Sequence, residues 1–143
     1  MVTTFDPKLV VITVGGTPIS GFADGTFIRV ERETDTFTKV VGADGFVSRA
    51  KSNNKSGSIT ITLAQTSNSN SVLNALSTAD ELSNNGVVPC MIKDLSGTST
   101  YFSSSAWVRK PSNAEFGKEI SNREWVLDCA DISMKTEGNF PSL

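Results

Sequence analysis

The stretch TFIRVERETDTFTKVVGADGFVSRAKSNNKSGSITITL, from Thr26 to Leu63, decides the fold. Apolar and polar residues alternate in the runs at both of its ends. Because successive side chains of a strand point to opposite sides, each run predicts a β-strand with one apolar and one polar face. The apolar faces are formed by Ile28 and Val30 in the first run, and by Ile59, Ile61 and Leu63 in the second.

The opposite faces of the two runs are polar. They are expected to carry Arg29, Glu31, Glu33 and Asp35 in the first run, and Ser58, Thr60 and Thr62 in the second. Three carboxylates on one strand face could suggest a calcium site, but residues two apart along a strand are too spread to hold one ion without further ligands. A face in contact with water is the simpler interpretation of this pattern.

A basic segment, about residues 39–57, joins the two runs. Its cations are Lys39, Arg49, Lys51 and Lys55, and Asp44 is its one acid. Two paired strands need a loop of only a few residues, so this long loop is interpreted as an extension that reaches another subunit. A merely solvated loop and a nucleic-acid-binding arm are the alternatives; the segment's single aromatic residue, Phe46, argues against the second.

Composition limits the classes of function. The chain has 143 residues, enough for one domain with a substantial core. Its formal net charge is −2, which does not favour a nucleic-acid binder. It has no histidine, and therefore lacks the commonest general base and metal ligand. Cys90 and Cys129 lie in strand-like runs, and two buried free thiols are expected in preference to one disulfide.

The remaining sequence predicts further strands and one helix. Apolar residues recur at three- and four-residue spacing over about residues 71–82, with Asn70 or Ser71 as the cap and Asn84 to Gly86 as the stop. Strands are expected at 9–14, 87–92, 101–110 and within 115–134, where a change of phase near Cys129 predicts a bulge. The predicted fold is mainly β: an antiparallel sandwich or barrel with one flanking α-helix.

The two ends of the chain do not show strand or helix periodicity. We expect a single domain over 1–143, with a flexible N-terminal arm at 1–8 and a polar C-terminal tail at 135–143. The start has no secretory leader pattern, and no apolar run approaches the length of about 20 residues that a membrane-spanning helix needs. Folding in a reducing cytoplasm, without contact with a membrane, is therefore expected.

An enzymatic function is not expected. A nucleophilic site needs Ser, Thr or Cys beside a base, and without histidine that base would have to be Lys or a carboxylate. The chain has no G-x-S-x-G motif, and Gly117-Lys118 lacks the following Ser or Thr of a phosphate-binding loop. We expect no catalytic residues, no bound metal and no cofactor.

Two long runs carry a family resemblance. One is VGGTPISGFADGTFIRVERETDTFTKVVGADGFVSRAKSNNKSGSITITL, within residues 13–63, and the other is WVRKPSNAEFGKEISNREWVLDCADI, residues 107–132. Both closely resemble the tail tube proteins of contractile-tailed bacteriophages. The resemblance extends over roughly residues 5–134, whereas the tail after Met134 shows no match.

The resemblance implies a structural protein of the virion. Tail tube proteins form hexameric rings that stack into a hollow tube inside a contractile sheath, and DNA leaves the capsid through the bore without being bound specifically. Sheath, baseplate and tail-terminator proteins are the implied partners, and assembly would occur in the host cytoplasm. A long loop between two early strands and the chain termini would contact the next ring.

This resemblance turns the two unusual surfaces into candidate sites. The bore is expected to be lined by the polar faces of the two runs, with Glu31, Glu33, Asp35, Thr60 and Thr62 as candidates. Arg29 is the exception on that face and could pair with a neighbouring carboxylate. The candidates for contacts between rings are Phe46, Arg49, Lys51 and Lys55. Two other readings stay open: a tube subunit of a phage-derived particle or secretion system, and a monomeric binding module.

Overall fold

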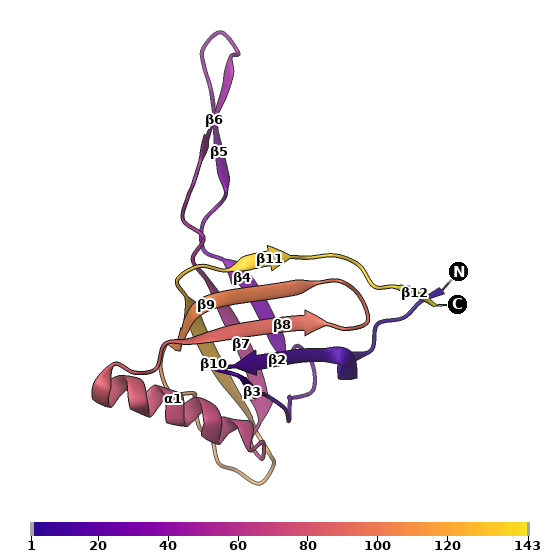
Figure 1. The fold of residues 1–143 in the computed structure, drawn as a ribbon, viewed down its shortest axis with the longest axis vertical. Helices are drawn as coiled ribbons and strands as arrows, with labels where there is room; N and C mark the ends of the chain where they lie inside the picture. The colour runs from indigo at the N-terminus through magenta and orange to yellow at the C-terminus, as the bar shows by residue number, and fades with distance from the viewer. Residues whose placement is uncertain (1, 143) are drawn as a thin grey trace.

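A computed structural model describes residues 2–142 as a mainly β structure with one α-helix (Figure 1). The main sheet has the strand order β3-β2-β8-β9-β10-β7-β4, with β11 paired to β9. Its strands are β2 Val10–Val14, β3 Thr17–Pro18, β4 Ile28–Arg32, β7 Gly57–Ala64, β8 Val88–Asp94, β9 Thr100–Val108, β10 Asn122–Cys129 and β11 Ser133–Lys135. The other elements are β1 Val2–Thr3, a 3-10 turn Pro7–Leu9, β5 Phe37–Val41, β6 Val47–Lys51, α1 Ser69–Ser83 and β12 Pro141–Ser142.

The main sheet folds over on itself to make two layers (Figure 1). Strand β9 belongs to both layers, because its first part pairs with β8 and β11 and its last part pairs with β10. Strands β2 and β8 lie in one layer, and β10, β7 and β4 lie in the other. All pairs are antiparallel, which confirms the predicted fold class.

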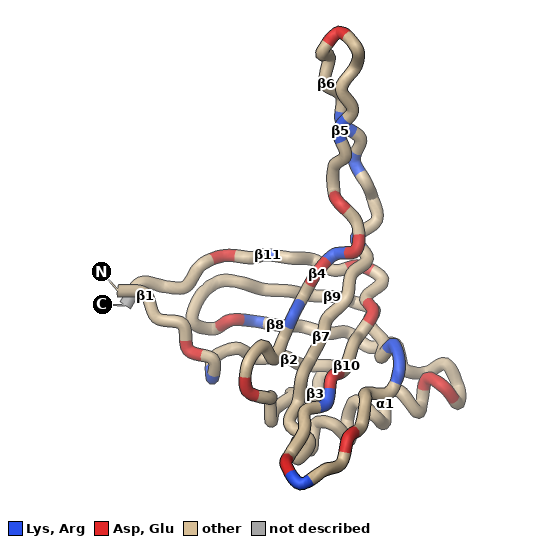
Figure 2. Tube along the Cα trace, turned by 180° about the vertical axis from the view of Figure 1, so that it is seen from behind, with Lys and Arg blue, Asp and Glu red and all other residues tan. Residues whose placement is uncertain are grey.

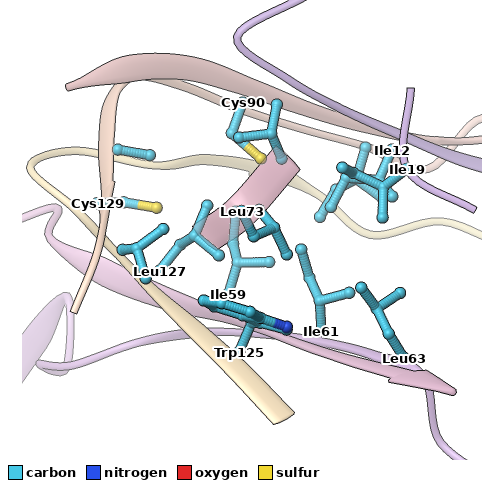
Figure 3. Packing of buried hydrophobic residues seen from close by; sticks show 14 of the residues in the cluster. Ile12, Ile19, Ile59, Ile61, Leu63, Leu73, Cys90, Trp125, Leu127 and Cys129 are labelled. Atoms are coloured by element: carbon cyan, nitrogen blue, oxygen red, sulfur yellow. The ribbon is translucent and has the colours of Figure 1, made fainter. Parts of the chain in front are cut away.

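The core lies between the two layers and is closed on one side by the helix (Figure 3). Every second residue of β7 is buried, which is the pattern expected of a strand with one face on a core. Leu73 of the helix is fully buried in this core. The large residues that meet there include Ile12, Val14, Ile59, Ile61, Leu63, Leu73, Ile92, Trp125, Leu127 and Ile132.

Helix α1 confirms the helix prediction but begins differently. It ends where expected, at Asn84, whose left-handed backbone (φ 55°) closes the last turn. Its N-cap is Asn68, which makes no side-chain capping bond. Asn70, expected as a cap, is buried: its side-chain oxygen accepts a hydrogen bond from Trp125 Nε1 at 2.9 Å, and its amide nitrogen donates to the carbonyl of Ala64.

The basic segment at about 39–57 links two directly paired strands, as predicted. Strands β4 and β7 are partners from Ile28↔Ile61 to Arg32↔Gly57. Between them the chain forms a hairpin of its own, β5–β6, which projects away from the sandwich (Figure 1). We call residues 37–51 the projecting hairpin. The chain returns to the main sheet at Gly57, the first residue of β7. A side chain would not fit there, because a Cβ would lie 2.5 Å from the carbonyl oxygen of Glu31.

The predicted change of phase near Cys129 is real, but it is not a simple bulge in one strand. Strand β10 ends at Cys129, and β11 resumes the pairing with β9 at Ser133. The register irregularity lies between β8 and β9. As a result, Phe102 points outward and Tyr101 packs on the core, whereas simple alternation would put Phe102 on the same face as the buried Ala106 and Val108.

Both cysteines are buried free thiols, as predicted. Their sulfur atoms lie within the core beside Leu73 and Leu127 (Figure 3). Burial raises the pKa of the Cys90 thiol to about 12, and it also raises the pKa of Cys129. Both groups are therefore uncharged and shielded at neutral pH, as buried structural cysteines are.

The two ends of the described chain lie side by side. Val2 pairs with Ser142, and Thr3 with Pro141. The expected flexibility of the arm and tail in a free subunit stays a prediction, and their outermost residues, Met1 and Leu143, lie outside the described residues. Within residues 2–142, no helix is long and apolar enough to cross a membrane.

The bond between Asn70 and Trp125 gives a stability prediction. Replacing Asn70 by Ala leaves the buried indole N–H and nearby loop carbonyls without partners, which should lower the free energy of unfolding by about 2–3 kcal/mol. Asn74→Ala, on the exposed side of the same helix, is the matched control and should change it by less than about 0.5 kcal/mol. Urea denaturation measures both; equal effects would contradict the assigned role.

Candidate functional site

The outer surface of β4, β7 and β10 is polar, and Figure 2 views the molecule from this side. Cross-strand pairing aligns Arg29 with Thr60, Glu31 with Ser58, and Thr62 with Glu124. The inward side chains of the same strands form the core, so the strand period fixes which residues face out. We call this surface the polar face; it consists of Arg29, Glu31, Ser58, Thr60, Thr62, Glu124, Val126 and Asp128.

Three of the predicted channel-lining residues come together on the polar face. Glu31, Thr60 and Thr62 line a shallow hollow of about 280 Å³, together with Thr26, Arg29 and Glu124. The arrangement follows from the two-residue period of β4 and β7, as the sequence pattern predicts. Small hydroxyl side chains form its middle and carboxylates lie toward its sides.

The other two predicted channel-lining residues lie elsewhere. Strand β4 ends at Arg32, whose guanidinium donates to the carbonyl of Ile132 at 2.8 Å. Glu33 and Asp35 therefore lie beyond the strand, in the exposed segment that leads to the projecting hairpin. Glu33 accepts a hydrogen bond there from the hydroxyl of Ser56 at 3.4 Å.

Ion pairs neutralise part of the charge on the polar face. Arg29 Nε lies 3.4 Å from Glu31 Oε1, so the cation of this face does pair with a neighbouring carboxylate. Arg109 binds Asp128 through two nitrogens, with a shortest distance of 2.6 Å, and this bond raises the pKa of Arg109. The carboxylate of Glu124 forms no ion pair within the described residues, which leaves the polar face weakly acidic.

Sequence reasoning missed the contribution of β10 to this surface. Glu124 and Asp128 alternate with the buried residues Trp125 and Leu127, so the same two-residue period could have placed them outward. Their neighbours on β7 could not be deduced, because pairing between strands distant in sequence is not visible in local periodicity.

The projecting hairpin is exposed along its whole length. Its turn covers residues 42–46, with Gly45 at φ 87° and the amide of Gly42 bonded to the carbonyl of Phe46 at 2.8 Å. Its exposed large apolar residues are Phe37, Val40, Val41, Phe46 and Val47, between 45% and 71% accessible. A lone two-stranded hairpin is only marginally stable in water, and exposed apolar residues of this kind mark a contact surface.

One face of the projecting hairpin gathers its cations. The register places Lys39 directly opposite Arg49, and Lys51 opposite Phe37, so all four share one side. Arg49 lies over the Phe37 ring at 4.2 Å from its centroid, a favourable cation–π distance. None of these three cations has a carboxylate partner within residues 2–142.

The candidates for contacts between rings are thus partly brought together. Phe46 lies at the turn of the projecting hairpin, and Arg49 and Lys51 lie on β6. Lys55 lies outside the hairpin at its base, where its carbonyl accepts the amide of Ile132 at 2.8 Å. Sequence reasoning missed the apolar members on β5, because it treated residues 39–57 as irregular.

Hydrogen bonds tie the C-terminal segment to the turn between β8 and β9. Asn139 Nδ2 donates to Asp94 Oδ2 at 2.8 Å, and the hydroxyl of Thr98 bonds to the carboxylate of Glu137. Hydrogen bonds from Ser96 lower the pKa of Asp94, and the bond from Thr98 lowers the pKa of Glu137. Both carboxylates are thus charged acceptors that hold this segment in place.

The fold is shared with chains of contractile injection systems. It matches a chain in the cryo-EM structure of the anti-feeding prophage cap, a tube-terminating cap, with a TM-score of 0.62 at 12% identity over 96% of this chain and 94% of the other. A chain of the PVC sheath/tube terminator gives 0.62 at 14% identity, covering 93% and 97%. A chain of the PVC sheath–tube complex gives 0.61 at 12%, covering 94% and 93%.

The sequence itself identifies the family. The model of the bacteriophage PhiTE tail tube protein family matches residues 10–136, and the chain belongs to this family. It is also 34% identical over 145 residues to structural protein ORF10 of Pseudomonas phage KPP10, covering 96% of this chain and 84% of that protein. These matches confirm the resemblance to phage tail tube proteins and place the chain among phage structural proteins.

Proposed function

We propose that this protein forms hexameric rings that stack into the inner tail tube of a contractile phage, through which DNA is delivered. The observation that carries the proposal is the tail tube family match over residues 10–136. The assembled virion is its place of action, after assembly in the host cytoplasm. In this role the protein is a structural component without an enzymatic activity or a cofactor.

An assembly explains the surfaces that a monomer leaves without partners. Strand β4 has one strand partner, β7, within the described residues, so its outer edge is free. The projecting hairpin exposes apolar and cationic side chains together. Free strand edges and exposed patches favour uncontrolled association unless a defined partner covers them. A closed ring of identical subunits covers the same edge and the same patch in every subunit.

The polar face is proposed to line the bore. A conduit should not retain DNA, and Lys or Arg contacts to phosphate supply most of the sequence-independent affinity of proteins for DNA. Glu31, Thr60 and Thr62 lie on this surface, with the missed Glu124 beside them. The cations Arg29 and Arg109 are occupied by carboxylates. Glu33 and Asp35, on the segment leading to the hairpin, would lie at one end of the bore.

The ring is also proposed to contact other proteins of the tail and the neighbouring ring. Sheath and terminator partners are supported by the likeness to chains from a PVC sheath–tube complex and from tube terminators. A baseplate protein would contact the last ring. Phe46, Arg49, Lys51 and Lys55 are proposed to contact the neighbouring ring, with the hairpin as the main element.

The first test removes the hairpin without touching the core. Residues 38–50 are replaced by Asn-Gly, which leaves Phe37 and Lys51 as the closing pair. Because every residue removed is exposed, the free energy of unfolding should change by less than about 1 kcal/mol. Stacking into tubes should be lost, while single rings persist; electron microscopy and light scattering measure this.

A matched control keeps the hairpin but alters an exposed site elsewhere. Leu82→Ser, at the end of α1, removes an apolar side chain that is 81% exposed and should leave the tubes intact. Tubes of normal length from the hairpin-truncated protein would contradict the proposed contact. A protein that stays monomeric at every concentration would instead favour a binding module.

The second test concerns the bore. Glu31→Lys and Glu124→Lys, made separately, should leave folding intact because both side chains are exposed. Repeated in every subunit, each should make tubes retain short duplex DNA at low salt, with retention falling as salt rises. Glu81→Lys, on the exposed end of α1, makes the same change of charge and should not. DNA passage unchanged in both test variants would contradict this assignment of the bore.

A further inference from the structure

The end of the molecule opposite the projecting hairpin is formed by the loop between β9 and β10. Figures 1 and 2 show the two features at opposite ends of the longest axis. We call residues 109–121 the distal loop. It contains the sequence Glu115-Phe-Gly-Lys-Glu-Ile120, and every residue of this run is exposed. Apart from Arg109, which pairs with Asp128 of the polar face, the loop takes no part in the proposed bore.

The distal loop exposes two large apolar side chains. Phe116 is 78% accessible and Ile120 is 68% accessible, more than most apolar residues of the hairpin. The guanidinium of Arg123 lies over the Phe116 ring, 5.7 Å from its centroid. Two apolar clusters therefore lie at opposite ends of the same subunit, and each is uncovered.

Acidic side chains of the distal loop can pair with cations of the hairpin; the loop also contains Lys110 and Lys118, so the match is between individual side chains and not between net charges. Phe116 directly follows Glu115, and Ile120 directly follows Glu119; neither carboxylate forms an ion pair in the described part of the chain. The hairpin offers three unpaired cations on one face, with Lys39 opposite Arg49. Like charges directly across a strand pair are unfavourable, so this face gains from an acidic partner.

We propose that the distal loop of one subunit receives the projecting hairpin of a second copy of this chain in the next ring. An interface between two different surfaces of identical subunits repeats without closing when the copies are related by translation along an axis. Opposite ends of the longest axis meet that requirement. The inference rests on the proposed stacking of rings and names the surface that accepts the hairpin.

The surroundings of the distal loop offer a place for the hairpin tip. Where Pro111 and Ser112 leave the sheet, the loop borders a hollow of about 380 Å³ next to α1. Ala75, Ala114 and Trp125 contribute to its lining, together with polar side chains that include Asn74 and Arg123. Phe46, at the hairpin turn, enters this hollow. The cations of β5 and β6 lie farther from the hairpin turn and face Glu115 and Glu119 of the distal loop.

Cysteine cross-linking in assembled tubes tests the contact. Ala43→Cys, in the hairpin turn, is combined with Gly117→Cys, at which an added Cβ meets nothing within 4 Å. The native Cys90 and Cys129 are buried and should not react. Treatment with a short bismaleimide should give a ladder on denaturing gels that continues past six subunits, because each link joins successive rings.

The control pair is Ala43→Cys with Leu95→Cys, an exposed position in the turn between β8 and β9. It should cross-link at most one-tenth as much. A ladder that stops at six subunits would mean that the hairpin reaches a neighbour within its own ring, and would overturn the inference while leaving the tube intact. Normal tubes without cross-links would also overturn it. Failure of the unmodified protein to form tubes would overturn the proposed function itself.

A charge exchange provides a second arm that does not rely on cysteine placement. Arg49→Glu with Lys51→Glu should raise the concentration needed for stacking by at least about tenfold, because the weakened contact recurs around each ring. Adding Glu115→Lys with Glu119→Lys should restore stacking, whereas adding Glu81→Lys should not. If the hairpin and loop substitutions together weaken stacking by the sum of their separate effects, with no rescue, the two ends do not meet.

Discussion

The two-residue period of β7 is the constraint on which the rest of the structure depends. Its buried residues Ile59, Ile61 and Leu63 lie at the centre of the core, and the residues between them form the middle of the polar face. A slip of one residue would exchange the two sets, so core packing and surface polarity are fixed by the same register. The neighbouring strands β4 and β10 inherit this division through their pairing with β7.

The core does not account for the whole molecule. Residues 33–51 contribute no buried side chain, yet they include five large apolar residues and three cations that have no carboxylate partner in the described part of the chain. A two-stranded hairpin without a core gains little stability by itself, so its shape is useful chiefly where another surface completes it. The chain belongs to the tail tube family, and in the proposed assembly further copies of the chain supply that surface.

Sequence patterns predicted the strands and the helix that have one face buried in the core. They missed the strands in which neither face is buried. Alternation identified β4 and β7, and three- and four-residue spacing identified α1. The strands β5 and β6 were missed because neither side of them is buried, so no alternation marks them. The inner position of Tyr101 depends on an irregular register with β8, and the bond from Trp125 to Asn70 joins residues 55 apart; neither leaves a local signal.

A helical cryo-EM reconstruction of tubes formed by the purified protein would show directly how the sandwich is oriented within the assembly. The proposed orientation gives a hollow tube of stacked six-subunit rings in which β4, β7 and β10 face the bore and the projecting hairpin crosses to the next ring. A reconstruction in which this polar face lies on the outside of the tube, or is buried against another subunit, would contradict it.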